Sequence, residues 1–169
     1  MSRGNKSADA ILMRQYAKYI KDRVIDEYVE FRMSPKNPRR WYARIHDLAG
    51  EHDEFINGEY LIRIDATNGY PYDPPEFRFL TNNGVYDCKE KVCTDMSPDH
   101  PEGYPASIGL MGYVKELVFG MICWSGLGLG RHILHTNCDK KKCLALASHE
   151  YNLKHHSDIL QLFQAELSL

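Results

Sequence analysis

Residues 70 to 84 read Tyr70-Pro71-Tyr72-Asp73-Pro74-Pro75-Glu76-Phe77-Arg78-Phe79-Leu80-Thr81-Asn82-Asn83-Gly84, and Cys93 follows ten residues after Asn83. Three prolines within five positions exclude a helix there and stiffen the approach to a short apolar strand. The Asn-Asn-Gly that follows predicts a turn, because Asn and Gly tolerate left-handed backbone conformations. A cysteine just beyond such a rigid platform is either a buried filler or a nucleophile.

The length and composition indicate one ordinary globular domain. At 169 residues, the chain suffices for a single domain over 1–169 with its own core and is too short for two. A net charge of −2 argues against a nucleic-acid binder, which needs a basic face to neutralise phosphates. Basic residues gather near the N-terminus, most often a sign of a solvated helix face: Arg3, Lys6, Arg14, Lys18, Lys21 and Arg23.

Neither a membrane span nor a disulfide framework is expected. No apolar run approaches the roughly 20 residues that a spanning helix requires, and Met1 to Ala10 lacks the apolar core of a signal peptide. The five cysteines are odd in number and irregularly spaced, which excludes a complete disulfide framework. We therefore expect a cytoplasmic or nuclear protein.

The hydrophobic pattern predicts a helix followed by strands. Apolar side chains recur at roughly helical spacing from Asp9 to Phe31, and Ser34 to Pro38 is expected to end that helix in a loop. Alternating patterns predict strands at Trp41–Ile45, Tyr60–Ile64 and Glu76–Leu80. Between the first two, Glu51 to Gly58 is typical of a polar hairpin loop closed by Asn-Gly.

The second half begins with a long aperiodic segment and ends in helices. Thr81 to Ser107 has glycines, prolines and cysteines but no periodicity, and a loop of this length in a compact domain is generally disordered or functional. Helical patterns cover Ile108–Met121, Asp139–Tyr151 and His155–Leu167, with Thr136 or Asn137 as an N-cap. Strands grouped before helices predict an α+β domain with an antiparallel sheet.

Three segments resemble successive landmarks of the ubiquitin-conjugating enzymes: Trp41-Tyr42-Ala43-Arg44-Ile45, Phe55-Ile56-Asn57-Gly58-Glu59-Tyr60, and Tyr70 to Phe77. Within that family, Thr81-Asn82-Asn83-Gly84 resembles the J subgroup, which replaces the usual His-Pro-Asn motif with a Thr-x-Asn-Gly form. Cys93 to Ser97 and Leu144 to Lys154 also look like that subgroup. The resemblance implies a single ubiquitin-conjugating core with a four-stranded antiparallel meander, a long active-site loop and flanking helices.

This sequence departs from the subgroup in three places. J members normally continue into a linker and a C-terminal membrane anchor, so association with the endoplasmic reticulum is expected only if an anchor was removed after Leu169. Relatives carry Trp where Tyr104 stands, and Pro105 comes one residue early. The glycine-rich stretch from Trp124 to Asn137 matches poorly.

The resemblance assigns Cys93 as the nucleophile that takes ubiquitin from the activating enzyme as a thioester. Asn83 would donate a side-chain N–H to the reacting carbonyl oxygen or hold the loop that does. Asp95 and His100 are candidates to handle the proton of the acceptor amine, although a turn cap and a structural histidine are the plainer interpretations. The polar loop predicts an exposed Cys93, and Lys89 and Lys91 would favour its thiolate.

The resemblance also implies partners and the absence of a cofactor. The basic face of the first helix, Arg14, Lys18 and Lys21, would bind the activating enzyme, while Tyr72, Tyr104 and Ala106 match positions that dock RING ligases. Ubiquitin and protein substrates complete the expected partners, with lysine or hydroxyl groups as acceptors. No metal or cofactor is expected on this chain, because the upstream activating enzyme uses the ATP.

Rival interpretations remain open at this stage. A non-catalytic binding module with the same fold, or a conjugating enzyme for a related modifier, fits much of the pattern. Cys88, Cys93, Cys138 and Cys143 have spacings that just allow a zinc site, although Cys143 falls in an apolar helical pattern that indicates core. A cysteine peptidase using Cys93 and His100 has no orienting third residue at a recognisable spacing.

Overall fold

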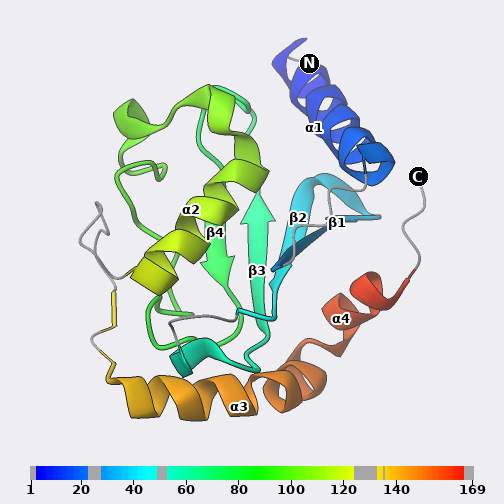
Figure 1. The fold of residues 1–169 in the computed structure, drawn as a ribbon. Helices are drawn as coiled ribbons and strands as arrows, with labels where there is room; N and C mark the ends of the chain where they lie inside the picture. Colours follow the sequence, from blue (N-terminus) through cyan, green and yellow to red (C-terminus); the bar gives the residue numbers. More distant parts are fainter. Residues whose placement is uncertain (1–2, 23–27, 49–52, 124–132, 135, 166–169) are drawn as a thin grey trace.

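The computed structural model describes residues 3–22, 28–48, 53–123, 133–134 and 136–165, with the backbone alone for residues 3–7. Its centre is an antiparallel meander in which each strand pairs with the next along the chain (Figure 1). The strands are β1 (Val29–Ser34), β2 (Asn37–Ile45), β3 (Tyr60–Asp65) and β4 (Glu76–Phe79). This sheet confirms the α+β class and the four-stranded meander expected from the sequence.

The strands form where apolar and polar side chains alternate. In β2, Trp41, Ala43 and Ile45 are buried, and Trp41 and Ala43 stand opposite Ile64 and Ile62 of β3. Since alternate side chains of a strand point to opposite faces, this register gathers the apolar residues on one face of the sheet.

The predicted helix from Asp9 to Phe31 was wrong at its C-terminal end. Helix α1 (Arg3–Asp22) ends before a segment outside the described residues, and Val29 and Phe31 are buried positions of β1. Ser34 to Pro38 is the turn region between β1 and β2, not the end of a helix. Over a window as short as this one, apolar residues at alternate positions such as Val29 and Phe31 also fit one face of a helix. Pairing with β2 makes this segment a strand.

The described part of the chain has three further α-helices: α2 (Gly109–Cys123), α3 (Cys138–His155) and α4 (Ser157–Gln164). The predicted N-cap at Asn137 is confirmed, since its side-chain oxygen accepts a hydrogen bond from the Lys140 N–H at 2.9 Å. The end of the last predicted helix, at Leu167, lies outside the described residues.

The two faces of the sheet are covered differently. The large core joins the inner face to α1 and α2, and the Phe77 and Tyr113 rings lie 4.4 Å apart between β4 and α2. A smaller cluster joins Leu61 of β3 to Ile159, Leu160 and Phe163 of α4 on the other face. In Figure 1, α2 lies across the sheet, whereas α3 runs past one end of the strands.

The hairpin loop has its predicted turn residue but also contributes a side chain to the core. Asn57 has a φ of 62°, as the Asn-Gly signal predicts, but Phe55 in the same loop is fully buried. Among the described residues, one segment, Ala106–Cys123, is long and apolar enough to cross a membrane by length and composition alone. Leu110, Tyr113 and Leu117 of this segment pack in the core, and core helices pass the same test.

Candidate active site

The Thr81–Tyr86 turn is closed by the side chain of Asn83. This side chain is fully buried, and its Oδ1 accepts hydrogen bonds from the N–H groups of Val85 at 2.9 Å and Tyr86 at 2.8 Å. Its Nδ2 donates to the Thr81 carbonyl at 3.3 Å. The predicted turn is therefore present, and Asn83 holds it together.

Gly84 is required in this turn for two reasons. Its φ of 75° lies in the left-handed region that L-residues rarely adopt, as the sequence predicts. A Cβ at this position would also lie 2.9 Å from Cγ of Lys141 on α3. The turn thus packs closely against the first part of α3.

Cys93 is more buried than the polar sequence around it suggested. The residue is 9% exposed, so the expectation of an exposed thiol was wrong. Its neighbour Val92 donates a backbone hydrogen bond to the Phe77 carbonyl of β4 at 2.8 Å, which draws the segment onto the sheet. Of the two nearby lysines, Lys91 pairs with Glu76, while Lys89 is exposed.

Thr94 and Tyr113 anchor the segment on the C-terminal side of Cys93. Their hydroxyls are hydrogen-bonded to each other in the core, and the Thr94 carbonyl accepts bonds from the backbone N–H and hydroxyl of Ser97 at 3.1 and 2.9 Å. Burial raises the pKa of Tyr113 to about 12 against the effect of the Thr94 bond, and the charges of Asp95 and Cys93 add to the rise. Both groups therefore lie within electrostatic reach of the phenol.

Sequence reasoning missed both residues of this pair. Tyr113 interrupts an otherwise apolar helical pattern, and a buried tyrosine hydroxyl needs a hydrogen-bond partner. That requirement was a usable signal, but the sequence does not show that Thr94 meets it.

A cavity of about 280 Å³ opens beside this segment. Thr94, Asp95 and Met96 line it from the loop, and Tyr113, Glu116 and Phe119 are among its lining residues on α2. The cavity next to the Thr94–Met96 segment thus combines aromatic walls with two carboxylates.

Asp95 and His100 both lie in the predicted loop and reach solvent. Asp95 is exposed, and the His100 side chain is 43% exposed with its Nδ1 at 3.9 Å from a Glu102 carboxylate oxygen. Both side chains are open to solvent, and the proton-transfer roles of both residues stay predictions.

Tyr104 was wrongly expected on a docking surface. The residue is only 7% exposed, and its ring packs 6.1 Å from that of Tyr113. Its hydroxyl is buried without a hydrogen-bond partner among the described residues, and burial raises its pKa. Tyr104 is therefore a core residue at the base of the loop that carries Cys93.

The other predicted docking residues are accessible. Arg14, Lys18 and Lys21 are exposed on α1, and Tyr72 is 80% exposed in its proline-rich loop. Lys18 and Ala106 line one groove of about 380 Å³ between α1 and the beginning of α2. Positions that are far apart in the sequence thus share one surface.

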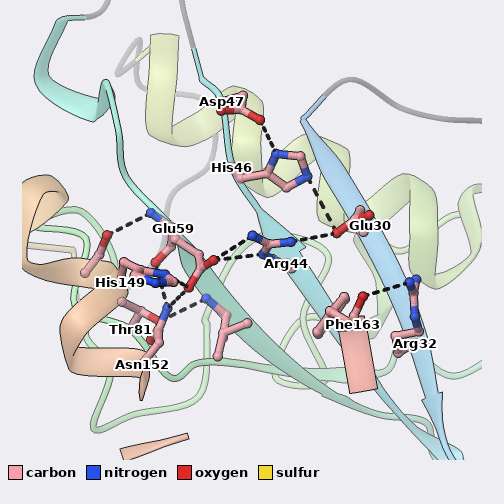
Figure 2. Close-up of polar contacts among 12 residues, drawn as sticks. Glu30, Arg32, Arg44, His46, Asp47, Glu59, Thr81, His149, Asn152 and Phe163 are labelled. Carbon is pink, nitrogen blue, oxygen red and sulfur yellow. Dashed lines mark hydrogen bonds and ion pairs between the residues drawn. The ribbon is translucent and has the colours of Figure 1, made fainter. Parts of the chain in front are cut away.

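A buried polar cluster lies behind the turn, and sequence reasoning missed it (Figure 2). Glu59 on the approach to β3 pairs with Arg44 of β2 at 2.8 Å and lies 3.2 Å from His149 of α3. Asn152 of α3 bonds both Glu59 and Thr81. Polar residues must pair with one another when they are buried, but the sequence does not show which of them are buried.

The described residues contain no group of three or more His, Cys, Asp or Glu that could hold a metal ion. Cys138 and Cys143 are exposed on α3, so the interpretation of Cys143 as core was wrong, whereas Cys93 is buried beside the sheet. The four cysteines of the alternative zinc site are not gathered in this part of the chain.

Known proteins provide an independent comparison. Ubiquitin-conjugating enzyme E2 34 of Arabidopsis thaliana is 31% identical over 143 residues, which cover 85% of this chain and 57% of that protein. Human ubiquitin-conjugating enzyme E2 J2 is 24% identical over 152 residues, which cover 90% of this chain and 56% of that protein. The chain spans about half the length of these relatives.

The solved structure of human ubiquitin-conjugating enzyme E2 G1 superposes with a TM-score of 0.56 at 18% identity, covering 70% of this chain and 94% of that one. No family model matches the sequence. The structural likeness supports the fold. The relatives found by sequence are ubiquitin-conjugating enzymes, and some of them are J2 forms. By sequence and by fold, this chain belongs to the ubiquitin-conjugating enzyme family.

Proposed function

We propose that this chain accepts ubiquitin as a thioester on Cys93 and transfers it to a lysine amine of a protein substrate. The Cys93 thiolate attacks the thioester that joins ubiquitin to the activating enzyme, a new C–S bond forms, and the thiolate of that enzyme leaves. The acceptor amine then attacks the same carbonyl, an amide forms, and Cys93 leaves as the thiolate. A substrate hydroxyl is the alternative acceptor.

One observation carries the proposal: two thiols stand between two anchored parts of an otherwise irregular loop, and Cys93 lies directly beside one of these anchors. The Asn83 turn and the Thr94–Tyr113 pair hold the chain on either side of Cys93. The other cysteine of this loop is less suited to attack, because burial raises the pKa of Cys88 to about 11 and Asp87 adds to the rise.

Asn83 has two roles in this proposal. Its Oδ1 fixes the turn, while its Nδ2 carries two hydrogens and can donate to Thr81 and to a developing oxyanion together. One such donor is commonly worth about 10²–10³ in rate. The acceptor proton passes to Asp95 or His100, both accessible from solvent.

The same proposal assigns the partners. Arg14, Lys18 and Lys21 on α1 bind the activating enzyme, and Tyr72 and Ala106 meet a RING ligase. An exposed tyrosine on a proline-rich loop is suited to anchor a small interface. The five free cysteines suit a reducing compartment, cytoplasm or nucleus.

A charging assay tests the proposal. Incubation with the activating enzyme, ATP and ubiquitin is expected to give a ubiquitin adduct that a thiol reductant removes and that Cys93→Ala cannot form. Cys88→Ala is the matched control and is expected to charge normally. An adduct that survives in Cys93→Ala, or no reductant-sensitive adduct at all, would contradict the enzyme proposal.

The assay also separates the alternatives. A non-catalytic binding module would retain ubiquitin in a pull-down but form no adduct. An enzyme for a related modifier would charge with that modifier and its own activating enzyme, and not with ubiquitin.

A further inference from the structure

Asn152 of α3 is fully buried, and every polar atom of its side chain is used (Figure 2). Its Oδ1 accepts a hydrogen bond from the Thr81 hydroxyl at 2.6 Å, and its Nδ2 donates to the Glu59 carbonyl at 3.0 Å and to Glu59 Oε1 at 3.1 Å. Since both partners of Nδ2 are acceptors, the orientation of the amide is fixed, and its oxygen must face Thr81.

Thr81 is held from two directions at once. Its hydroxyl gives its single hydrogen to Asn152 and accepts the backbone N–H of Leu61 in β3 at 3.0 Å. The first residue of the active-site turn is thereby tied both to the sheet and to α3. Thr81 is 1% exposed, so solvent cannot replace either bond cheaply.

The hydrogen bonds continue from Thr81 into the turn. The Thr81 carbonyl accepts from Nδ2 of Asn83, whose Oδ1 in turn receives the N–H groups of Val85 and Tyr86. Asn152 is therefore linked to Asn83 through two atoms of Thr81: the hydroxyl, which bonds Asn152, and the carbonyl, which bonds Asn83. A change at Asn152 can reach the turn without any contact with a substrate.

The charged side of the cluster keeps Asn152 in place. Arg44 binds the Glu59 carboxylate through Nε at 2.9 Å and Nη2 at 2.8 Å. Burial disfavours the charge on Glu59, but the bonds from Asn152, Arg44 and His149 outweigh it and lower the pKa of the carboxyl. An ionised Glu59 can only accept, which keeps the Asn152 amide turned toward it.

We propose that Asn152 is a positioning residue for the reaction at Cys93, which acts through Thr81 to hold the Asn83 turn. The inference rests on the proposed function, because Asn83 assists transfer only if Cys93 carries a thioester. Loss of Asn152 leaves Asn83 in the chain but removes the contact that fixes the start of its turn. Transfer then slows while binding of the activating enzyme, at α1, is unaffected.

The kinetic test compares charging with discharge. Asn152→Ala is expected to slow single-turnover discharge of the Cys93 thioester to free lysine by about tenfold, since misplacement by 1 Å can cost about a hundredfold. Its charging rate is expected to stay within about twofold of wild type, because charging depends on the α1 surface and the thiol. Equal slowing of both steps would overturn the positioning role.

Ser148→Ala is the matched control. Ser148 is buried on the same helix, but its hydroxyl bonds the Glu59 N–H and the Ala145 carbonyl instead of Thr81, and so it lies off the proposed chain. This variant is expected to lose stability and to discharge within about twofold of wild type. If it discharges as slowly as Asn152→Ala, general loosening of α3 explains the effect and the proposal fails.

Substitutions at Thr81 keep the test decisive if Asn152→Ala does not fold. Thr81→Val removes the hydroxyl at similar volume and is expected to slow discharge as Asn152→Ala does, while Thr81→Ser retains the hydroxyl and is expected to restore it. A Thr81→Val variant that discharges at the wild-type rate would overturn the proposal.

Amide hydrogen exchange separates this proposal from the proposed function, because it needs no ubiquitin. The Val85 and Tyr86 amides are expected to exchange faster in Asn152→Ala or Thr81→Val than in Ser148→Ala at matched stability. If the wild-type protein forms no thioester but the variants still show these differences in exchange, only the proposed function is contradicted. Unchanged exchange at both amides contradicts the positioning role, whatever the charging assay gives.

Discussion

On its α3 side, the loop from Thr81 to Ser107 is held by the hydrogen bonds of Asn152, Thr81 and Asn83. On its α2 side, the same loop is held by Thr94 and Tyr113. The α3-side support is made of directional bonds between small polar groups. The α2-side support has one hydroxyl pair set in aromatic packing, with the Tyr113 ring against Phe77. Hydrogen bonds fix geometry at a modest net gain in stability, whereas buried rings contribute most of the stabilisation.

The difference predicts which variants affect stability and which affect geometry. Damage to the α2-side support should mainly lower the free energy of unfolding. Damage to the α3-side support should disturb the turn at a smaller cost in stability. Four predictions test this contrast, taken from the largest expected effect to the smallest.

Tyr113→Ala is expected to lower the free energy of unfolding by about 3–5 kcal/mol, since it removes a fully buried ring from the core. Urea denaturation measures the loss. Tyr113→Phe is the control and should cost about 1 kcal/mol, because only the bond to Thr94 is lost. Equal losses in the two variants would show that the hydroxyl pair, not the ring, stabilises the α2 side.

Asn83→Ala is expected to cost about 2–4 kcal/mol, because it leaves the buried N–H groups of Val85 and Tyr86 without their acceptor. Thermal or urea unfolding measures it. The neighbouring Asn82 is exposed and accepts one long bond from Gly84, so Asn82→Ala should change stability by about 0.5 kcal/mol or less. If the two variants lose similar amounts of stability, the hydrogen bonds of the Asn83 side chain do not hold the turn.

The charge on Glu59 predicts an acid sensitivity of the α3-side support. The pKa of this carboxyl is lowered in the folded state, so the unfolded chain binds the proton more readily. Its contribution is present above the unfolded pKa, near 4.3, and is lost as pH falls through the lower folded pKa. Stability measured between pH 6 and pH 3, in buffers of about equal ionic strength, should therefore fall more steeply in wild type than in Glu59→Gln. Parallel curves would contradict the prediction.

Tyr72→Ala should have the smallest effect on stability, within about 0.5 kcal/mol, because the residue is 80% exposed and belongs to neither support. Under the proposed function, its effect appears only with a RING ligase, as a several-fold loss of ligase-stimulated discharge. Intrinsic discharge without ligase should not change. A loss of intrinsic discharge would place Tyr72 in the active site instead of at an interface.

Local sequence signals predicted much of the fold correctly. Alternation predicted three of the four strands, Asn137 was recognised as a helix cap, and Gly84 adopts the left-handed conformation that its turn requires. These features depend on a few consecutive residues, and so they can be read without the rest of the chain. The first strand was missed because Val29 and Phe31 fit a helical period as well as an alternating one.

Burial was the property that local patterns predicted least well. Cys93 was expected near the surface because its loop is polar, and Tyr104 because of the family resemblance, yet both are buried beside Tyr113 and β4. Cys143 was expected in the core and is exposed. The accessibility of a loop residue depends on which distant elements cover it, and the sequence near the residue does not contain that information.

The sequence by itself determined the strand and turn before Cys93, the order of the elements and the family resemblance, because each of these is encoded in short contiguous motifs. Only the tertiary structure decided which groups support the turn. Thr81 and Asn152 are separated by 71 positions, and Thr94 and Tyr113 by 19. Such pairs form because the sheet and the helices bring polar groups together where water is excluded, so each buried group must find a partner within the protein.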